Sequence, residues 1–360
     1  MVFRKSPESP EIPESPEPSG NLRNPRKSRN LRNPPETPGN PGTTGNPGTP
    51  GNPRNLRNLR NLRNPRKTKI ITPKKYIVML KVEELVDKLI DLAFAEDIGD
   101  GDHTTLCCIP EDAMGKSHLL IKEDGVLAGV EVAKEVFRRF DPQLKVEVLM
   151  GDGTRVKKGD IAMVVSGRVR SLLQTERLML NIMQRMSGIA TQTSKYVEKL
   201  KGTGTRVLDT RKTTPGLRML EKAAVKIGGG CNHRIGLFDM ILLKDNHVDF
   251  AGGICNAIDR CHEYLKKNNL DLKIEIEVRN FDELQQVLDR GGVDRIMLDN
   301  FTPADTRKAV EIIDHRYETE SSGGITFDTL RDYAECGVDF ISVGALTHSV
   351  KGLDMSFKAC

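Results

Sequence analysis

The segment IEIEVRNFDELQQVLDRGGVDRIMLDN, residues 274–300, decides the fold class of this chain. It contains two short apolar runs, and each run ends in a carboxylate, Glu277 or Asp299. The stretch between them, 281–290, is predicted to be a helix. A buried strand, a helix of this length and a second buried strand are typical of one parallel β/α unit.

The same unit recurs on both sides of this segment. Other apolar runs end in charged or small residues at 209–211, 244–245, 322–324 and 344. Further helical spacers are predicted at 251–267, 303–313 and 326–336. Six units over about 150 residues indicate a barrel, with an open parallel sheet as the alternative.

The part of the chain before residue 205 has a different pattern. Apolar spacing predicts helices at 81–96, 129–140 and 171–200. Short apolar runs separated by glycine-containing turns indicate a β-rich segment, with strands at 117–121, 145–149 and 161–165.

Residues 96–105, EDIGDGDHTT, contain Asp97, Asp100 and Asp102, which could suggest a calcium loop. The EF-hand pattern fails, because its central glycine and its closing glutamate are not at the required positions. We therefore predict a loop rich in turn-forming residues.

The first 75 residues have low complexity. They hold 15 of the 19 prolines and carry 16 Lys+Arg against 5 Asp+Glu, so the excess of positive charge in the chain belongs to them. Such a segment cannot bury enough apolar surface to fold, and we predict a disordered basic tail over 1–78. The simplest interpretation of this tail is an appended extension without a function of its own. The alternatives are a basic arm that binds RNA or anionic lipid, and a transit peptide. Met79 is the candidate for the true start.

Several classes of protein are disfavoured by composition. No run of 18 apolar residues occurs, which argues against a membrane span. The seven cysteines include no CxxC pair, so reduced thiols in a cytoplasmic protein are predicted. A metal site built on Cys255, Cys261 and His262 is disfavoured, because no second pair of Cys or His ligands follows at the spacing that zinc sites require.

Charged residues concentrate where the predicted strands end. In β/α barrels these ends form the active site. A group of Arg and Lys suits a substrate with several carboxylates or phosphates, and two carboxylates suit Mg²⁺ or ribose hydroxyls. The residues are Arg211, Lys212, His233, Arg234, Lys244, Glu277 and Asp299.

Small residues follow the last two predicted strands, at Ser322–Gly324 and at Val343–Ala345. Small side chains let backbone amides approach an anion, and barrels often bind phosphate after their last strands. A purely structural turn is the alternative at either position. Glycines 228–230 are predicted to form a flexible loop that positions His233 and Arg234, with a helix stop as the alternative.

From about residue 81 to 358, these segments resemble the quinolinate phosphoribosyltransferases. The matching stretches are EDIGDGDHTT at 96–105, ERLMLNIMQRMSGIAT at 176–191, LDTRKTTPGLR at 208–218, GGGCNHRIGLFDMILLKDNH at 228–247, IEIEV at 274–278, IMLDN at 296–300, SSGGI at 321–325 and VGALTHS at 343–349. The resemblance implies transfer of phosphoribosyl from phosphoribosyl pyrophosphate to quinolinate, with loss of CO₂, to give nicotinate mononucleotide.

The fold class implied is α/β. An open-faced α/β sandwich is expected at 79–185, to which about 351–360 return. An incomplete (β/α) barrel is expected at 186–350. The family acts as a homodimer or a hexamer, and Arg177 is expected to reach the partner's site.

The resemblance also implies residue roles. Lys212, Glu277 and Asp299 are expected to be catalytic, and the two carboxylates are expected to bind Mg²⁺, largely through the substrate. The substrate-binding residues implied are Arg177, Thr210, Arg211, Lys212, His233, Arg234, Lys244, Glu277, Asp299, Ser322, Gly323, Gly324, Val343, Gly344 and Ala345.

Three other functions remain as alternatives. An enzyme of the same fold could take nicotinate without decarboxylation, but a monoacid would leave buried cations unpaired. A molybdate-linked paralogue with another ligand is the second. The third is nucleic-acid binding through the tail, which no aromatic-interleaved motif supports. Neither a nucleic acid nor a membrane is expected as a partner.

Overall fold

The computed structural model describes residues 82–360, and the predictions for 1–78 and Met79 lie outside them. Within the described part of the chain, no helix has the length and apolarity needed to cross a membrane. All seven cysteines are free, as predicted.

An antiparallel sheet forms the first layer of the molecule. Its strands are β1 (Met114–Ile121), β3 (Lys145–Val148), β5 (Ile161–Arg168) and β12 (Met355–Ala359), in the order β12-β1-β5-β3. The last strand returns from the far end of the chain, and Met355 pairs with Ile121. A small ladder joins β2 (Gly125–Val126) to β4 (Arg155–Val156).

Three helices accompany this sheet: α1 (Val82–Ile98), α2 (His103–Cys108) and α3 (Val130–Phe140). The loop predicted for 96–105 is partly wrong, because a short helix begins at His103. Asp102 caps that helix, and its Oδ1 accepts a hydrogen bond from the Thr105 backbone at 3.0 Å.

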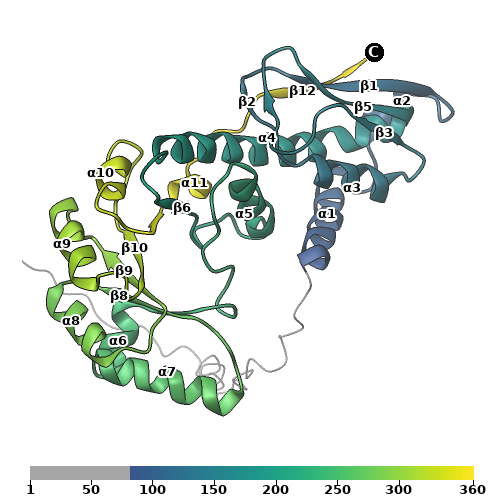
Figure 1. Cartoon of the computed structure of the whole chain (residues 1–360). Coiled ribbons are helices and arrows are strands. Elements are labelled where there is room, and N and C mark those ends of the chain that lie inside the picture. The colour runs from purple at the N-terminus through teal and green to yellow at the C-terminus, as the bar shows by residue number, and fades with distance from the viewer. Residues whose placement is uncertain (1–81) are drawn as a thin grey trace, which may run out of the picture. The chain divides into compact units, whose positions relative to one another are not determined.

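The long helix α4 (Val169–Lys199) connects the two halves of the fold. It packs against α3 and β5 of the first half and against α5 (Arg218–Ile227) of the second (Figure 1). Gly188 lies against the backbone of Lys351, where a β-carbon would clash. The helix can therefore approach the segment that leads into β12.

A six-stranded parallel sheet forms the second part, in the order β6-β11-β10-β9-β8-β7. All its neighbours pair in parallel. From β7 to β11, each strand pairs with the strand that follows it in sequence. The exception is β6, which pairs with β11 instead of β7, so β6 and β7 form the two edges of the sheet. The sheet is thus a barrel with one open seam, which confirms the predicted α/β class. The strands are β6 (Arg206–Leu208), β7 (Ile241–Leu243), β8 (Ile274–Val278), β9 (Arg295–Asp299), β10 (Glu318–Ser322) and β11 (Phe340–Ser342).

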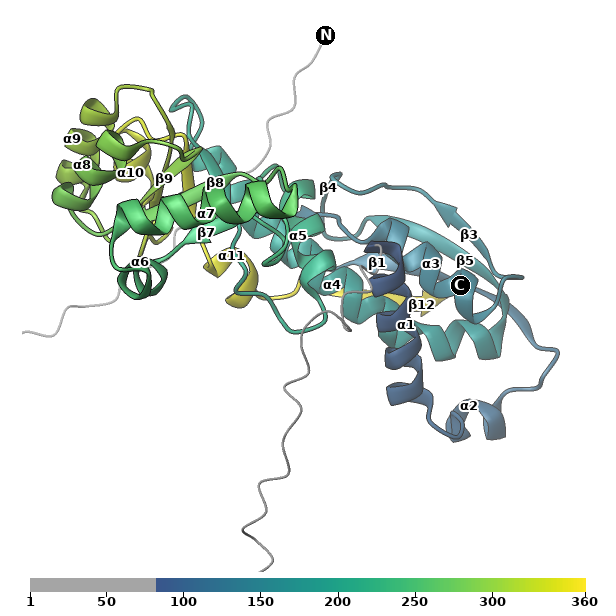
Figure 2. The same cartoon turned by 90° about the horizontal axis from the view of Figure 1, so that it is seen from below.

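Helices α7, α8 and α9 lie outside the parallel strands (Figure 2). Local sequence explains where these helices begin. Asn280 caps α8 by accepting from the Glu283 backbone at 2.9 Å, and Thr302 caps α9 with Pro303 in its first turn. The bounds are α5 (Arg218–Ile227), α6 (Asp245–Ala251), α7 (Ile254–Asn268), α8 (Phe281–Arg290), α9 (Pro303–Ile313), α10 (Leu330–Ala334) and α11 (Ala345–His348).

The chain between β6 and β7 borders the open seam. Cys231 forms an isolated parallel bridge with Leu208, the last residue of β6. Glycines 228–230 end α5 and lead into this bridge, so the helix stop that was the alternative is present. The seam brings His233 and Arg234 beside the strand ends.

Candidate active site

A cavity of about 780 Å³ opens at the carboxyl ends of the parallel strands. The strand bounds explain its composition. Asp299 and Ser322 are the last residues of β9 and β10, Glu277 is one residue from the end of β8, and Lys244 directly follows β7. Residues from these four strand ends therefore face one space, as is usual for active sites of β/α barrels.

The structure brings thirteen of the predicted site residues into this cavity lining. They are Thr210, Arg211, Lys212, His233, Arg234, Lys244, Glu277, Asp299, Ser322, Gly323, Gly324, Gly344 and Ala345. Two others lie elsewhere. Val343 is buried behind the lining and donates its N–H to the Leu208 carbonyl at 2.9 Å. Arg177 is exposed on α4, outside the cavity of its own chain.

One wall of the cavity is cationic. Burial and the nearby charge of Arg211 both lower the pKa of Arg234. The Nε of Arg211 is buried without a hydrogen-bond partner among the described residues. No ion pair in residues 82–360 involves Arg211, Lys212 or Arg234. Because none of these three cations is neutralised by a direct ion pair in that part of the chain, this wall is suited to an anionic ligand.

The cavity lining also carries two carboxylates, Glu277 and Asp299. Burial raises the pKa of Asp299, and the neighbouring Glu277 raises it further. Lys244 Nζ lies 3.0 Å from Glu277 Oε2, and Asn300 donates to Asp299 Oδ2 at 2.7 Å. Two adjacent hard oxygen donors fit a divalent cation such as Mg²⁺, because the cation would relieve their mutual repulsion.

The loop after β10 is shaped for close backbone approach. Gly323 has φ of +95°, and a β-carbon there would collide with the Asn300 side chain and backbone. Only glycine combines this positive φ with the absence of a β-carbon. No side chain at this position therefore covers the loop backbone at the cavity. Such a loop can hold a phosphate through backbone N–H groups.

A buried polar cluster includes two residues of the cavity lining, His233 and Glu320. His233 Nε2 is 3.0 Å from Glu275 Oε2 and 3.5 Å from Glu320 Oε2, and Arg295 Nη1 is 3.1 Å from Glu320 Oε2. His233 Nδ1 accepts from the Arg234 N–H at 2.7 Å. Burial lowers the pKa of His233. Both ring nitrogens of His233 therefore face protein groups, which orients the ring.

The sequence-based prediction missed Glu275 and Glu320. A signal existed for the first, because residues two apart on a strand share a face, so Glu275 lies on the same side as Glu277. Asn300 and His348 line the cavity within motifs already quoted, beside residues that were chosen. The remaining missed lining residues are Leu242, Met297, Ile325, Thr326 and Ser342.

The buried carboxyls predict how stability depends on pH. Burial raises the pKa of Glu320 to about 8 and that of Glu275 to about 7. An unfolded glutamate loses its proton near pH 4.3, about the model-peptide pKa, so between that pH and about 8 the folded state binds more protons. Stability should therefore fall as pH rises through this window.

We expect the thermal midpoint of unfolding to decline between about pH 5 and pH 8, and to decline less in Glu320→Gln. Melting curves followed by circular dichroism measure both slopes. Glu318→Gln is the matched control, because this partner of Arg295 is partly exposed. Parallel slopes for the wild type and Glu320→Gln would show that Glu320 does not hold a proton in the folded state.

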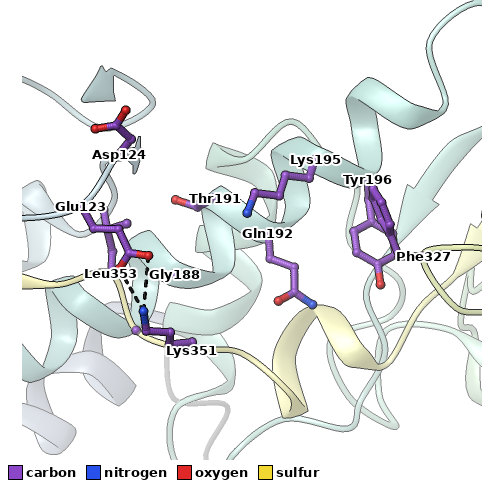
Figure 3. Close-up of a pocket in the computed structure, with 11 residues that line it drawn as sticks. Glu123, Asp124, Gly188, Thr191, Gln192, Lys195, Tyr196, Phe327, Lys351 and Leu353 are labelled. Atoms are coloured by element: carbon purple, nitrogen blue, oxygen red, sulfur yellow. Dashed lines mark hydrogen bonds and ion pairs between the residues drawn. The ribbon is translucent and has the colours of Figure 1, made fainter. Parts of the chain in front are cut away.

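A second cavity, of about 330 Å³, lies along α4. Figure 3 shows Lys351 directed toward Glu123 and the Tyr196 ring beside Phe327. The Lys351–Glu123 ion pair measures 3.3 Å, and the two rings lie 5.0 Å apart, edge to face. The charges of Lys351 and Glu123 in this second cavity thus neutralise each other. No strand end of the parallel sheet contributes to the lining of this cavity. The first cavity is the better candidate for chemistry.

Comparison with known proteins identifies the family of this chain. The model of the quinolinate phosphoribosyl transferase N-terminal domain matches residues 102–187, and that of the C-terminal domain matches 189–358. The chain belongs to this family. It is therefore a nicotinate-nucleotide pyrophosphorylase (carboxylating), with quinolinate phosphoribosyltransferase activity in NAD biosynthesis.

Relatives support the assignment over most of the chain. Identity is 47% to the chloroplastic nicotinate-nucleotide pyrophosphorylase (carboxylating) of Arabidopsis thaliana, covering 75% of this chain and 81% of the relative. It is 44% to a mitochondrial quinolinate phosphoribosyltransferase (decarboxylating) of Nicotiana tabacum, with the same coverage. The crystal structure of NadC from Streptococcus pyogenes superposes with a TM-score of 0.73 at 39% identity, covering 78% of this chain and 97% of that one. These relatives occupy different compartments, so they do not assign one to this chain.

Proposed function

We propose that the cationic wall of the cavity binds the two carboxylates of quinolinate and part of the pyrophosphate of phosphoribosyl pyrophosphate. The observation that carries this proposal is the group of Arg211, Lys212 and Arg234, which have no ion-pair partner among residues 82–360. A guanidinium fork matches a carboxylate bidentately, and a diacid neutralises more of this wall than a monoacid does. Ser322–Gly324 and Gly344–Ala345 hold the 5′-phosphate.

The reaction needs positioning more than a protein nucleophile. The ring nitrogen of quinolinate attacks C1 of the ribose while pyrophosphate leaves, and the transition state resembles an oxocarbenium ion. The cations of the wall stabilise the charge on the leaving pyrophosphate. Loss of the 2-carboxylate as CO₂ follows: the bond from C2 to the carboxylate breaks, the adjacent positive ring nitrogen stabilises the electron pair left on C2, and C2 then takes a proton from solvent.

Glu277 and Asp299 are proposed to contact the ribose hydroxyls and to hold Mg²⁺, largely through the substrate. When bound, the ion neutralises charge on the pyrophosphate. Lys244, which pairs with Glu277 at 3.0 Å, keeps that carboxylate oriented toward the cavity.

Arg177 is proposed to complete the site of a partner chain in a homodimer or a larger assembly. It is exposed on α4 and absent from the cavity of its own chain. The isologous interface of a two-fold dimer lets each chain donate the same residue to the other.

The cytoplasm is proposed as the compartment, because Glu8, Glu11, Glu14 and Glu17 are unusual in a transit peptide. Import of the full-length chain into isolated plastids or mitochondria, with loss of its N-terminal segment, would contradict this.

Substrate choice is tested by a paired assay. The full-length protein is incubated with phosphoribosyl pyrophosphate, Mg²⁺ and either quinolinate or nicotinate, and CO₂ and nicotinate mononucleotide are measured. We expect both products from quinolinate and no turnover of nicotinate. Turnover of nicotinate at a comparable rate would show that the wall does not select the diacid.

A further inference from the structure

A fully buried ion pair lies behind the cationic wall. Asp209 directly follows β6 and is 0% exposed, and Lys222 on α5 is 2% exposed. Lys222 Nζ contacts Asp209 Oδ1 and also donates to the His233 carbonyl at 3.0 Å. The ammonium group thus joins α5 to both segments that border the barrel seam.

The Asp209 carboxylate holds the second segment as well. Its Oδ1 accepts the His233 backbone N–H at 3.0 Å, and its Oδ2 accepts the Asn232 side-chain amide. Asn232 also donates to the Lys222 carbonyl at 2.9 Å. The three residues and the His233 backbone form a closed ring in which both carboxylate oxygens have partners.

This arrangement is not an efficient source of stability. Burial raises the pKa of Asp209 and lowers the pKa of Lys222, so both charges are held at a desolvation cost. Buried ion pairs can often be replaced by uncharged residues of similar volume without loss of stability. A reason other than stability is needed for keeping both charges here.

We infer that Asp209 and Lys222 are positioning residues, which set the distance and orientation between the two cation-bearing segments 210–212 and 232–234. Arg211 and Lys212 follow Asp209 directly, and His233 and Arg234 follow Asn232. The ring therefore fixes where the guanidinium groups of Arg211 and Arg234 stand relative to each other. This inference rests on the proposed role of these cations in binding quinolinate.

The decisive variant is Asp209→Asn/Lys222→Met, which removes both charges together and leaves one acceptor oxygen for the His233 N–H, while Asn232 keeps its bond to the carbonyl of residue 222. We expect it to fold with a thermal midpoint close to that of the wild type. We expect kcat/KM for quinolinate to fall about 100-fold, mostly through KM, because misplaced binding groups lose that much. A structural role alone would lower the midpoint or the active fraction and would leave KM unchanged.

Asp339→Asn is the matched control. Asp339 lies at the opposite end of the same parallel sheet, where its Oδ2 accepts from the Thr319 N–H at 2.8 Å and from the Thr319 hydroxyl at 2.9 Å. It should lose some stability and keep its KM. The variant Lys212→Ala distinguishes a failure of the positioning inference from a failure of the proposed binding site. If Lys212→Ala is impaired and the double variant has the wild-type KM, the ring does not position the wall. If Lys212→Ala itself behaves as the wild type, the proposed site is wrong.

Should the double variant fail to fold, Asn232→Ala decides the question. It keeps the ion pair and frees one carboxylate oxygen from the second segment. A severalfold rise in KM for quinolinate, with an unchanged melting curve, supports positioning. An unchanged KM overturns it.

Discussion

Replacement of Lys212 by alanine is expected to lower kcat/KM for quinolinate about 100- to 1,000-fold, the usual effect of removing one preorganised charge or donor from an active site. Lys212 lines the cavity, and its backbone is held by hydrogen bonds on both sides of its α-carbon. Its N–H donates to Thr210 Oγ1 at 3.0 Å, and its carbonyl accepts from Thr347 Oγ1 at 2.9 Å. These bonds fix the backbone position from which the Lys212 ammonium group enters the cavity, where it can meet the developing charge.

Initial rates with varied quinolinate and varied phosphoribosyl pyrophosphate measure this effect. Lys226→Ala is the matched control, because Lys226 is an exposed lysine in the last turn of α5 and does not line the cavity. It should keep wild-type kinetics. A loss of less than tenfold in Lys212→Ala would exclude a direct role for Lys212 in the transition state.

Mixing inactive chains is expected to restore activity. Arg177→Ala chains lack the residue that we propose each chain donates to its partner, and Lys212→Ala chains lack a residue of the cavity itself. A mixed dimer of the two has one site with both residues intact and one site with neither. Random exchange makes half the dimers mixed, so about a quarter of all sites should recover.

The mixture of Lys212→Ala with Asp299→Asn serves as the control. Both residues line the cavity of one chain, so every site in a mixed dimer remains defective. Exchange itself is measured with chains that carry different tags. If the first mixture stays inactive after proven exchange, Arg177 is not shared between chains.

Strands, helices and the charges at strand ends could be predicted from the sequence, because each depends on residues that lie close together along the chain. Strand β8 and helix α8 follow from the apolar run at 274–276 and the helical spacing at 281–290. Charges at strand ends, such as Glu277 and Asp299, follow because parallel strands place those ends at one edge. The prediction of a barrel succeeded because the β/α unit repeats.

Features that depend on distant pairing could not be predicted. Asp209 looked like an ordinary strand end, and its partner Lys222 follows only after a loop and a turn of helix. Glu320 could not be placed, because its burial depends on Arg295 from the neighbouring strand. Helix α2 was missed since Gly99 and Gly101 indicate turns, while the Asp102 side chain starts a helix just afterwards.

The position of β12 has a consequence for synthesis on the ribosome. Strand β1 emerges early, but Met355–Ala359, which covers one of its edges, is made after all six parallel strands. During translation β1 therefore keeps an open edge, and such edges invite pairing with other chains. Closing the ladder across so long a sequence separation is also slow. A nascent chain paused before residue 355 has an almost complete barrel and an incomplete first sheet, which is the form that most needs a chaperone.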